Sequence, residues 1–244
     1  MKLEGQAVLV TGAARRVGRT IALALAARGA RLALHYNSSR REAASLLREV
    51  RASGAEADIF QADLASPRAI EVLARKALAR FGAVRALVNN ASIYERTPLP
   101  VADARAWDAN MAINARAPFL LARALAPAMR RAGGGKIVNI ADWAGLRPYA
   151  DYIPYCASKA ALLCVNQALA KALGPSIQVN AVLPGPVLPP ERMGAAERKV
   201  VARANLLKRI GSPEDVAQAV LFFLEGSDFA TGAQLTVDGG RLIA

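Results

Sequence analysis

Apolar positions along the chain follow two alternating patterns. Short apolar runs typical of buried parallel strands alternate with longer stretches in which apolar residues recur at helical spacing. The strands are predicted at residues 7–10, 31–35, 56–61, 86–89, 136–140, 178–182 and 234–237. The helices are predicted at residues 17–28, 40–52, 67–80, 103–131, 152–173 and 213–225. We therefore expect an α/β fold, a Rossmann-type doubly wound sheet of seven mostly parallel strands with helices on both faces.

Three irregular segments rich in proline or glycine interrupt this pattern. They cover residues 91–102, 141–151 and 183–194, and each directly follows a predicted strand. In a doubly wound sheet, ligands bind at the edge formed by the carboxyl ends of the strands. The sequence therefore predicts a functional site built from these segments.

Length and composition favour one compact unit. The 244 residues are 54% hydrophobic, so residues 1–244 are expected to form a single domain with one sizeable core. No apolar run approaches the roughly 18 residues of a membrane helix, and the first residues do not resemble a signal peptide. We expect a cytoplasmic protein that does not bind membranes.

Few residues are available for metal binding or for histidine chemistry. The eight-residue separation of Cys156 and Cys164 fits neither a disulfide on a helix nor a zinc site. His35 is the only histidine and lies in an apolar stretch, which excludes a Ser-His-Asp triad and an HExxH zinc site. We expect no metal, and proton transfer has to use Tyr, Lys, Asp or Glu.

The net charge of +13 raises the question of nucleic-acid binding. The arginines, however, are spread along the whole chain among many alanines. This distribution is more typical of a solvated surface than of a binding stripe. We therefore do not expect a nucleic-acid partner.

A glycine-containing turn connects the first strand to an alanine-rich helix. The sequence TGAARRVGR at residues 11–19 places a helix N-terminus where backbone N–H groups can meet a pyrophosphate. The loop resembles the TGxxxGxG motif of the short-chain dehydrogenase/reductase family but carries Arg16 where the middle glycine is expected. This resemblance implies a phosphate site formed by Gly12, Arg15, Arg16, Val17 and Gly18.

The end of the second strand predicts the choice of cofactor. An Asp or Glu that would select NAD is absent there, and residues 35–41 read HYNSSRR. Hydroxyl, amide and cationic groups suit a 2′-phosphate, although the same residues also suit an ordinary N-cap on a basic helix. We expect NADPH, held at this point by Tyr36, Asn37, Ser38, Ser39 and Arg40.

Further cofactor contacts follow only from the family resemblance. Asp63 and Leu64 match an adenine-binding turn. The residues after the fourth strand match the NNAG motif, with Asn90, Ala91 and Ser92 at its last three positions. Pro184 and Gly185 match a turn beside the nicotinamide.

Tyr155 and Lys159 form a YxxxK motif. At i and i+4 of a helix their side chains share one face, so we expect the ammonium, together with oxidised nicotinamide, to favour the phenolate and lower the pKa of Tyr155. Tyr155 would then donate the proton in reduction. Both residues are also expected to contact the cofactor, with Lys159 holding the nicotinamide ribose. The resemblance adds Asn114, expected at a helix kink in a proton relay. It also predicts a Ser thirteen residues before the Tyr, where this chain carries Asp142.

Asp142 and Arg16 together resemble the pteridine reductase branch of the family. That branch implies a pterin lying between the nicotinamide and an aromatic side chain, here Tyr94. It also implies a substrate site of Arg16, Ser92, Tyr94, Asp142 and Tyr155. The resemblance further implies a homotetramer. The prolines and Met193 of residues 186–203 lead us to expect a mobile cover over the substrate there.

These observations favour NADPH-dependent reduction of a pterin or dihydropterin. The enzymatic alternative is a reductase of simple carbonyls such as 3-oxoacyl thioesters, against which Asp142 counts, because a carboxylate would repel a developing oxyanion. A non-catalytic cofactor-sensing or nucleic-acid-binding protein is a third reading. The presence of Tyr155, Lys159 and Asn114 argues against it.

Overall fold

The structure, a computed structural model, describes residues 1–189 and 193–244. Its centre is a single seven-stranded sheet in the order β3-β2-β1-β4-β5-β6-β7. The strands are β1 (Ala7–Val10), β2 (Arg31–Tyr36), β3 (Ala57–Gln61), β4 (Ala86–Asn89), β5 (Gly135–Ile140), β6 (Ile177–Pro184) and β7 (Gln234–Val237). The doubly wound fold is confirmed. Each neighbouring pair of strands is parallel, so the sheet is parallel throughout rather than mostly parallel.

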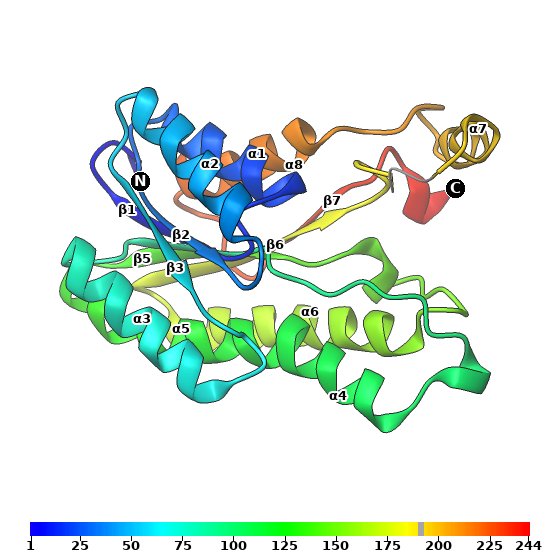
Figure 1. Ribbon diagram of the computed structural model, residues 1–244, viewed down its shortest axis with the longest axis horizontal. Helices are drawn as coiled ribbons and strands as arrows, with labels where there is room; N and C mark the ends of the chain where they lie inside the picture. Colours follow the sequence, from blue (N-terminus) through cyan, green and yellow to red (C-terminus); the bar gives the residue numbers. More distant parts are fainter. Residues whose placement is uncertain (190–192) are drawn as a thin grey trace.

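Helices cover both faces of this sheet (Figure 1). One layer contains α1 (Arg16–Ala26), α2 (Arg40–Ala52) and α8 (Pro213–Leu221). The other layer contains α3 (Pro67–Phe81), α4 (Ala104–Met111), α5 (Ala117–Arg131) and α6 (Ile153–Leu173). The short helix α7 (Ala195–Arg203) lies apart from both layers, near the C-terminus. None of the helices in the described part of the chain is both long and apolar enough to cross a membrane.

Burial of the strands explains why they read as continuous apolar runs. All residues of β1 and of β4 are buried, because helices cover the sheet on both sides. Two hydrophobic clusters fill the space between the sheet and its two helix layers. Leu25 and Val220 belong to the cluster under α1 and α8, and Leu73 and Leu121 to the cluster under α3 and α5.

The predicted helix at 103–131 is wrong in one respect. The segment is divided into α4, a π-helical turn (Ala112–Arg116) and α5. Pro118, near the start of α5, has no N–H to donate to the carbonyl of Asn114, so regular helical bonding must break here. The predicted helix at 213–225 likewise ends in a π-helical turn (Phe222–Gly226).

The helix α7 was not predicted. None of its residues, Ala195–Arg203, is buried, so the segment shows no apolar face from which a helix could be inferred. Its alanine, glutamate, arginine and lysine residues nevertheless have high helix propensity. It lies in the segment 186–203 that was expected to form a mobile cover, of which residues 190–192 lie outside the described part.

The strand order places a crevice at the carboxyl edge. Strand β1 lies between β2 and β4, so the chain leaves β1 towards one face and β4 towards the other. A cavity of about 1220 Å³ lies at this edge. The three irregular segments of the sequence contribute to its lining, as predicted.

Candidate active site

Two glycines shape the loop after β1. Gly12 has φ +61°, and a Cβ atom there would meet Cα of Ala91 at 2.9 Å. A Cβ atom on Gly18 would collide with the carbonyl oxygen of Gly12. Only glycine fits either position, because the backbones of two loops approach each other closely. The helix N-terminus therefore opens into the cavity as the motif predicted.

Asn90 ties this loop to β4. Its amide Nδ2 donates to the carbonyl oxygens of Thr11 at 3.0 Å and Gly12 at 3.1 Å. In return, the hydroxyl oxygen of Thr11 accepts from the backbone N–H groups of Asn90 and Ala91. These bonds explain why the TG and NNA motifs occur together. Gly12, Gly18, Asn90 and Ala91 all line the cavity, while their contacts with a cofactor stay predictions.

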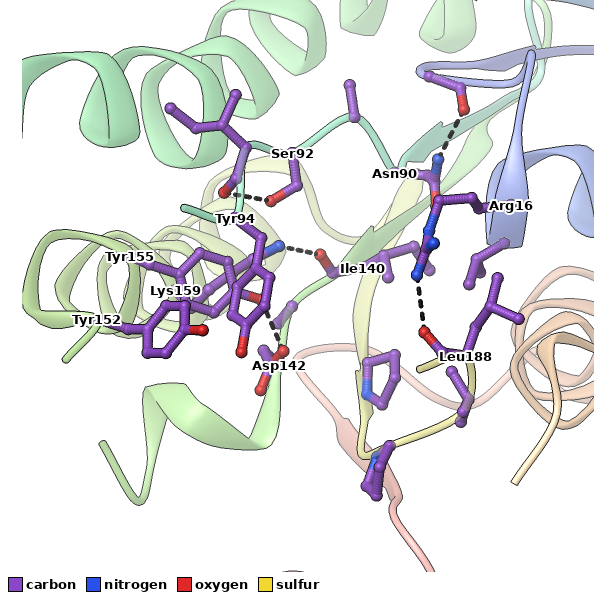
Figure 2. Close-up of a pocket in the computed structure, with 18 of the residues that line it drawn as sticks. Arg16, Asn90, Ser92, Tyr94, Ile140, Asp142, Tyr152, Tyr155, Lys159 and Leu188 are labelled. Carbon is purple, nitrogen blue, oxygen red and sulfur yellow. Dashed lines mark hydrogen bonds between the residues drawn. The ribbon is translucent and has the colours of Figure 1, made fainter. Parts of the chain in front are cut away.

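Arg16 connects the phosphate loop with the chain after β6. Its backbone has φ +52°, and its guanidinium Nη2 donates to the carbonyl oxygen of Leu188 at 2.7 Å (Figure 2). The neighbouring Arg15 and Val17 also line the cavity. The predicted contacts of Arg16 with pyrophosphate and pterin stay predictions.

The residues expected to bind the adenosine half are less closely grouped. Asn37, Asp63 and Leu64 line the cavity. Tyr36 is buried against Ala14 and Ala43. The remaining predicted residues, which follow Asn37 up to the start of α2 and do not line the cavity, are Ser38, Ser39 and Arg40. Their role at a 2′-phosphate stays a prediction.

Asp142 and Tyr155 are hydrogen-bonded to each other. Tyr155 Oη donates to Asp142 Oδ2 at 2.6 Å, and the backbone N–H of Ala144 donates to Asp142 Oδ1 at 2.7 Å (Figure 2). Asp142 caps the short 3-10 helix (Trp143–Gly145) after β5, whereas Tyr155 lies in the first turn of α6. The two elements therefore bring a carboxyl and a phenol together at the cavity wall.

The expected direction of the Tyr155 pKa was wrong for the protein by itself. Burial and the adjacent Asp142 raise the pKa of Tyr155 well above its usual value. Burial also raises the pKa of Asp142, although the bonds from Tyr155 and Ala144 and the charge of Lys159 partly offset this effect. The phenol therefore keeps its proton, which is the state that a proton donor requires.

Lys159 lies beside the ring of Tyr155 rather than at its hydroxyl. Its Nζ is 5.7 Å from the ring centroid and donates to the carbonyl oxygen of Ile140 at 2.9 Å. Burial lowers the pKa of Lys159 to about 8. The i, i+4 spacing correctly placed the two side chains on one face. The carboxyl of Asp142, which is hydrogen-bonded to the phenol, changes the pKa of Tyr155 more than the ammonium does.

Asn114 is buried in the π-helical turn between α4 and α5, the place at which the regular helix is interrupted. Its Oδ1 accepts from the backbone N–H of Ile93 at 3.0 Å, and its Nδ2 donates to Ser158 Oγ at 3.0 Å. Ser92 Oγ lies 3.0 Å from the same Oδ1. Asn114 thus holds the loop after β4 against α6, while its part in a proton relay stays a prediction.

An aromatic cluster forms one wall of the cavity. The ring of Tyr94 stacks on Tyr152, with centroids 4.6 Å apart and planes 8° apart. It also meets Tyr155 edge to face at 4.7 Å. Figure 2 shows these three tyrosines and Asp142 gathered on one side, across from Arg16 and Leu188. Tyr94 is thus placed beside Tyr155, as the substrate prediction requires.

Several lining residues were missed at the sequence level. Tyr152 precedes Tyr155 by three residues, a helical spacing that could have identified it. Trp143, Tyr149 and Arg241 gave no comparable signal. Arg241 comes from the last turn of the chain and lies over the Trp143 ring, 5.6 Å from its centroid. Only the packing of the C-terminal segment against the Asp142 loop brings it here.

Pro184 and Gly185, at the end of β6, line the cavity as predicted. A Cβ atom on Gly185 would meet Cβ of Asp238 at 2.6 Å. The close approach explains the glycine and links this turn to the VDGG sequence at residues 237–240. The VDGG sequence therefore packs directly against the turn at Pro184 and Gly185.

Comparisons with known proteins agree with this geometry. The family model described as Enoyl-(Acyl carrier protein) reductase matches residues 12–241. A 3-oxoacyl-(acyl-carrier-protein) reductase from Synechocystis sp. is 32% identical over 244 residues, which cover 99% of this chain and 98% of the relative.

Two solved structures are similar over nearly their whole length. A blue fluorescent protein from a metagenomic library, in complex with NADPH, has a TM-score of 0.91 and 35% identity, covering 99% of both chains. FolM alternative dihydrofolate reductase 1 from Brucella canis, complexed with NADP, has a TM-score of 0.93 and 34% identity, covering 100% of this chain and 96% of that one. On the family match and these full-length similarities, the chain belongs to the short-chain dehydrogenase/reductase family.

Proposed function

We propose that this protein is an NADPH-dependent reductase of a pterin or dihydropterin. The observation that carries the proposal is the hydrogen bond of 2.6 Å between Tyr155 Oη and Asp142 Oδ2 at the wall of the cavity. A carboxyl group at this place suits a substrate that offers N–H groups, and a 2-amino-pyrimidine edge does so.

NADPH is supported by residues and by similarity. No carboxylate follows β2 at residues 36–41, where an NAD-selective acid would stand, and Arg40 and Arg41 supply cations instead. The two solved relatives described above hold NADPH or NADP. When bound, the cofactor supplies the hydride for the substrate ring.

The side chains provide the proton and the orientation. Tyr155, whose pKa is raised by burial and by Asp142, keeps its proton until a ring nitrogen of the substrate accepts it. After the product has left, Asp142, whose pKa is raised by burial, can take up a proton from solvent and pass it to Tyr155 Oη along their shared hydrogen bond, which returns Asp142 to its ionised form. Asp142 in its ionised form accepts N–H bonds from the pyrimidine edge and orients the ring.

The aromatic wall suits a flat substrate. Tyr94 is 52% exposed although Tyr152 covers one of its faces, so aromatic surface remains accessible beside Tyr155. Heterocycles stack favourably on such rings. FolM, the structural relative with 34% identity, is described as an alternative dihydrofolate reductase, which also supports a substrate containing a pterin ring.

A reductase of simple carbonyls is the second candidate function. The observation in its favour is the full-length similarity to a 3-oxoacyl-(acyl-carrier-protein) reductase. Such chemistry places negative charge on the substrate oxygen in the transition state, next to the carboxyl of Asp142. Asp142 opposes that charge unless it is protonated, so the pterin is the preferred substrate.

The deciding experiment compares wild type, Asp142→Ala and Asp142→Ser. NADPH oxidation is measured with dihydropterin and, separately, with a 3-oxoacyl thioester. If the substrate is a pterin, the wild type turns over dihydropterin and both variants lose this activity by at least about 10²-fold, the scale of a positioned acid or base. Thioester turnover that rises in Asp142→Ser, with no pterin activity in any variant, would establish the carbonyl reductase instead.

A further inference from the structure

The single histidine of the chain has no part in the proposed chemistry, yet it lines the cavity and both of its ring nitrogens have hydrogen-bond partners. His35 lies in β2 and is 1% exposed. Its Nδ1 accepts from the backbone N–H of Gly12 at 3.1 Å, and its Nε2 lies 3.0 Å from the carbonyl oxygen of Ala62. The imidazole thus bridges two loops that are 50 residues apart (62 − 12 = 50).

The two partners determine the state of the imidazole. A backbone N–H only donates, so Nδ1 must present its lone pair to Gly12. A carbonyl only accepts, so Nε2 must carry the hydrogen that points to Ala62. Burial lowers the pKa of His35, which keeps this neutral form. A protonated imidazole would direct an N–H towards the N–H of Gly12.

The position of β2 makes this bridge possible. Strand β2 lies between β1 and β3, and the bridged loops follow those two neighbours. Main-chain bonds accompany the imidazole: the carbonyl of His35 accepts from Ala13 N–H at 2.9 Å, and the carbonyl of Tyr36 accepts from Ala62 N–H at 3.1 Å. Residues 35 and 36 therefore contact the phosphate loop and the 62–64 turn through both backbone and side chain.

We propose that His35 is a positioning residue for the cofactor, setting the spacing between the phosphate loop at Gly12 and the adenine-binding turn at Ala62. The inference rests on the proposed use of NADPH. A cofactor bound as the family resemblance implies would contact both loops, so loops held at the correct separation before binding would not have to be ordered during binding. Asp142 lies after β5 and Tyr155 lies in α6, so neither belongs to these loops. His35 therefore affects affinity and leaves the chemical step unchanged.

Three substitutions separate the two ends of the bridge. His35→Asn keeps an acceptor near the place of Nδ1 and loses the bond to Ala62. His35→Gln keeps a donor near the place of Nε2 and loses the bond to Gly12. His35→Leu removes both bonds while preserving an apolar volume. Each purified variant is titrated with NADPH by fluorescence in the absence of any pterin. KM for NADPH and kcat are then measured with dihydropterin as the substrate.

We expect the Kd and KM for NADPH to rise at least about 10-fold in His35→Leu, since two buried hydrogen bonds are lost. The increase is smaller in His35→Asn and His35→Gln, and kcat at saturating NADPH stays within about 2-fold of wild type. A wild-type Kd in His35→Leu would overturn the proposal. So would an equal increase in all three variants, or a loss confined to kcat.

The design remains decisive if His35→Leu does not fold, because Asn and Gln each remove only one bond and must each weaken NADPH binding. The cofactor and substrate claims are also separated. A wild type that binds NADPH but reduces no pterin overturns only the proposed substrate, and the Kd series still tests His35. A wild type that does not bind NADPH overturns both proposals.

Discussion

At the scale of single residues, one substitution relative to the family motif defines the site. Asp142 stands where the family carries a serine, and its carboxyl bonds directly to the phenol of Tyr155. The motif spacing predicted that these residues belong together. It predicted the wrong direction for the Tyr155 pKa, because that direction depends on burial and on the carboxyl at 2.6 Å.

Replacement of the phenol tests the proton donor. Tyr155→Phe should lower the rate of dihydropterin reduction by at least about 10²-fold, because the ring remains but the transferable proton is lost. NADPH binding, measured by fluorescence titration, should change less than about 3-fold, since the aromatic ring is retained and only one hydroxyl is lost. Ser176→Ala, which removes a hydroxyl that bonds to the carbonyl of Leu173 outside the cavity lining, is the control. Turnover retained at every pH would assign the proton to another group.

The buried carboxyl of Asp142 should lower the free energy of unfolding at neutral pH. Burial raises the pKa of Asp142 in the folded protein, so above that raised pKa the ionised form is less favourable folded than unfolded. Asp142→Asn should therefore unfold at a higher temperature than wild type at pH 7. As pH falls through the raised pKa towards the unfolded value of 3.8, the cost disappears and the difference should vanish.

Thermal melts from pH 3 to 8 measure this difference directly. Asp108→Asn, at an exposed carboxylate on α4, controls for the general effect of removing a negative charge. A variant less stable than wild type at pH 7 would show that the bonds from Tyr155 and Ala144 outweigh the burial of the charge.

At the scale of elements, close approach between backbones explains the motifs. The turn from β1 into α1 works because Gly18 leaves room for the carbonyl of Gly12 and the amide of Asn90. The π-helical turn between α4 and α5 works because it directs Asn114 at both the loop after β4 and α6. Residue types at motif positions that are far apart in the sequence are thus explained by direct contacts between those positions.

Adding one methyl group at the phosphate loop tests this explanation. Gly18→Ala should raise the Kd for NADPH by at least about 10-fold and lower the free energy of unfolding by roughly 1–3 kcal/mol, because the loop must shift to remove an overpacked contact. Gly194→Ala is the matched control, since a Cβ atom there would meet no heavy atom of the described residues within 4 Å. Fluorescence titration and urea melts give both quantities. Equal effects at the two positions would contradict the steric argument.

At the scale of the whole molecule, charge and apolar surface raise separate questions. The arginines that produce the net charge of +13 are spread over the chain, and several pair with carboxylates, as Arg31 and Arg80 do with Glu56. Apolar side chains are exposed on the outer helices, with Trp107 on α4 and Phe119 on α5 more than 40% exposed. Such surface is typical of an interface between subunits.

The homotetramer therefore stays a prediction with a direct test. Light scattering coupled to size-exclusion chromatography should give four times the chain mass of 25.7 kDa for wild type. Phe119→Glu should reduce the mass, because a charge would be buried in the interface. Val200→Glu, on the exposed face of α7, should leave it unchanged. A monomeric wild type would contradict the prediction.

The sequence alone determined the fold class, the strand positions and the membership of Gly12, Asp142 and Tyr155 in one site. Alternating apolar runs report how strands and helices are buried, and motif spacing reports which residues lie at the carboxyl edge. Strand ends, the π-helical turns and the solvent-exposed α7 were less accessible, because they leave no periodic apolar signal.

Only the tertiary structure decided how those residues act. The contact that raises the pKa of Tyr155, the stacking of Tyr94 on Tyr152 and the bridge through His35 all join residues from different elements. Their distances and burial depend on how sheet, loops and helices pack together. Electrostatic effects vary steeply with both, and neither can be read from the order of residues along the chain.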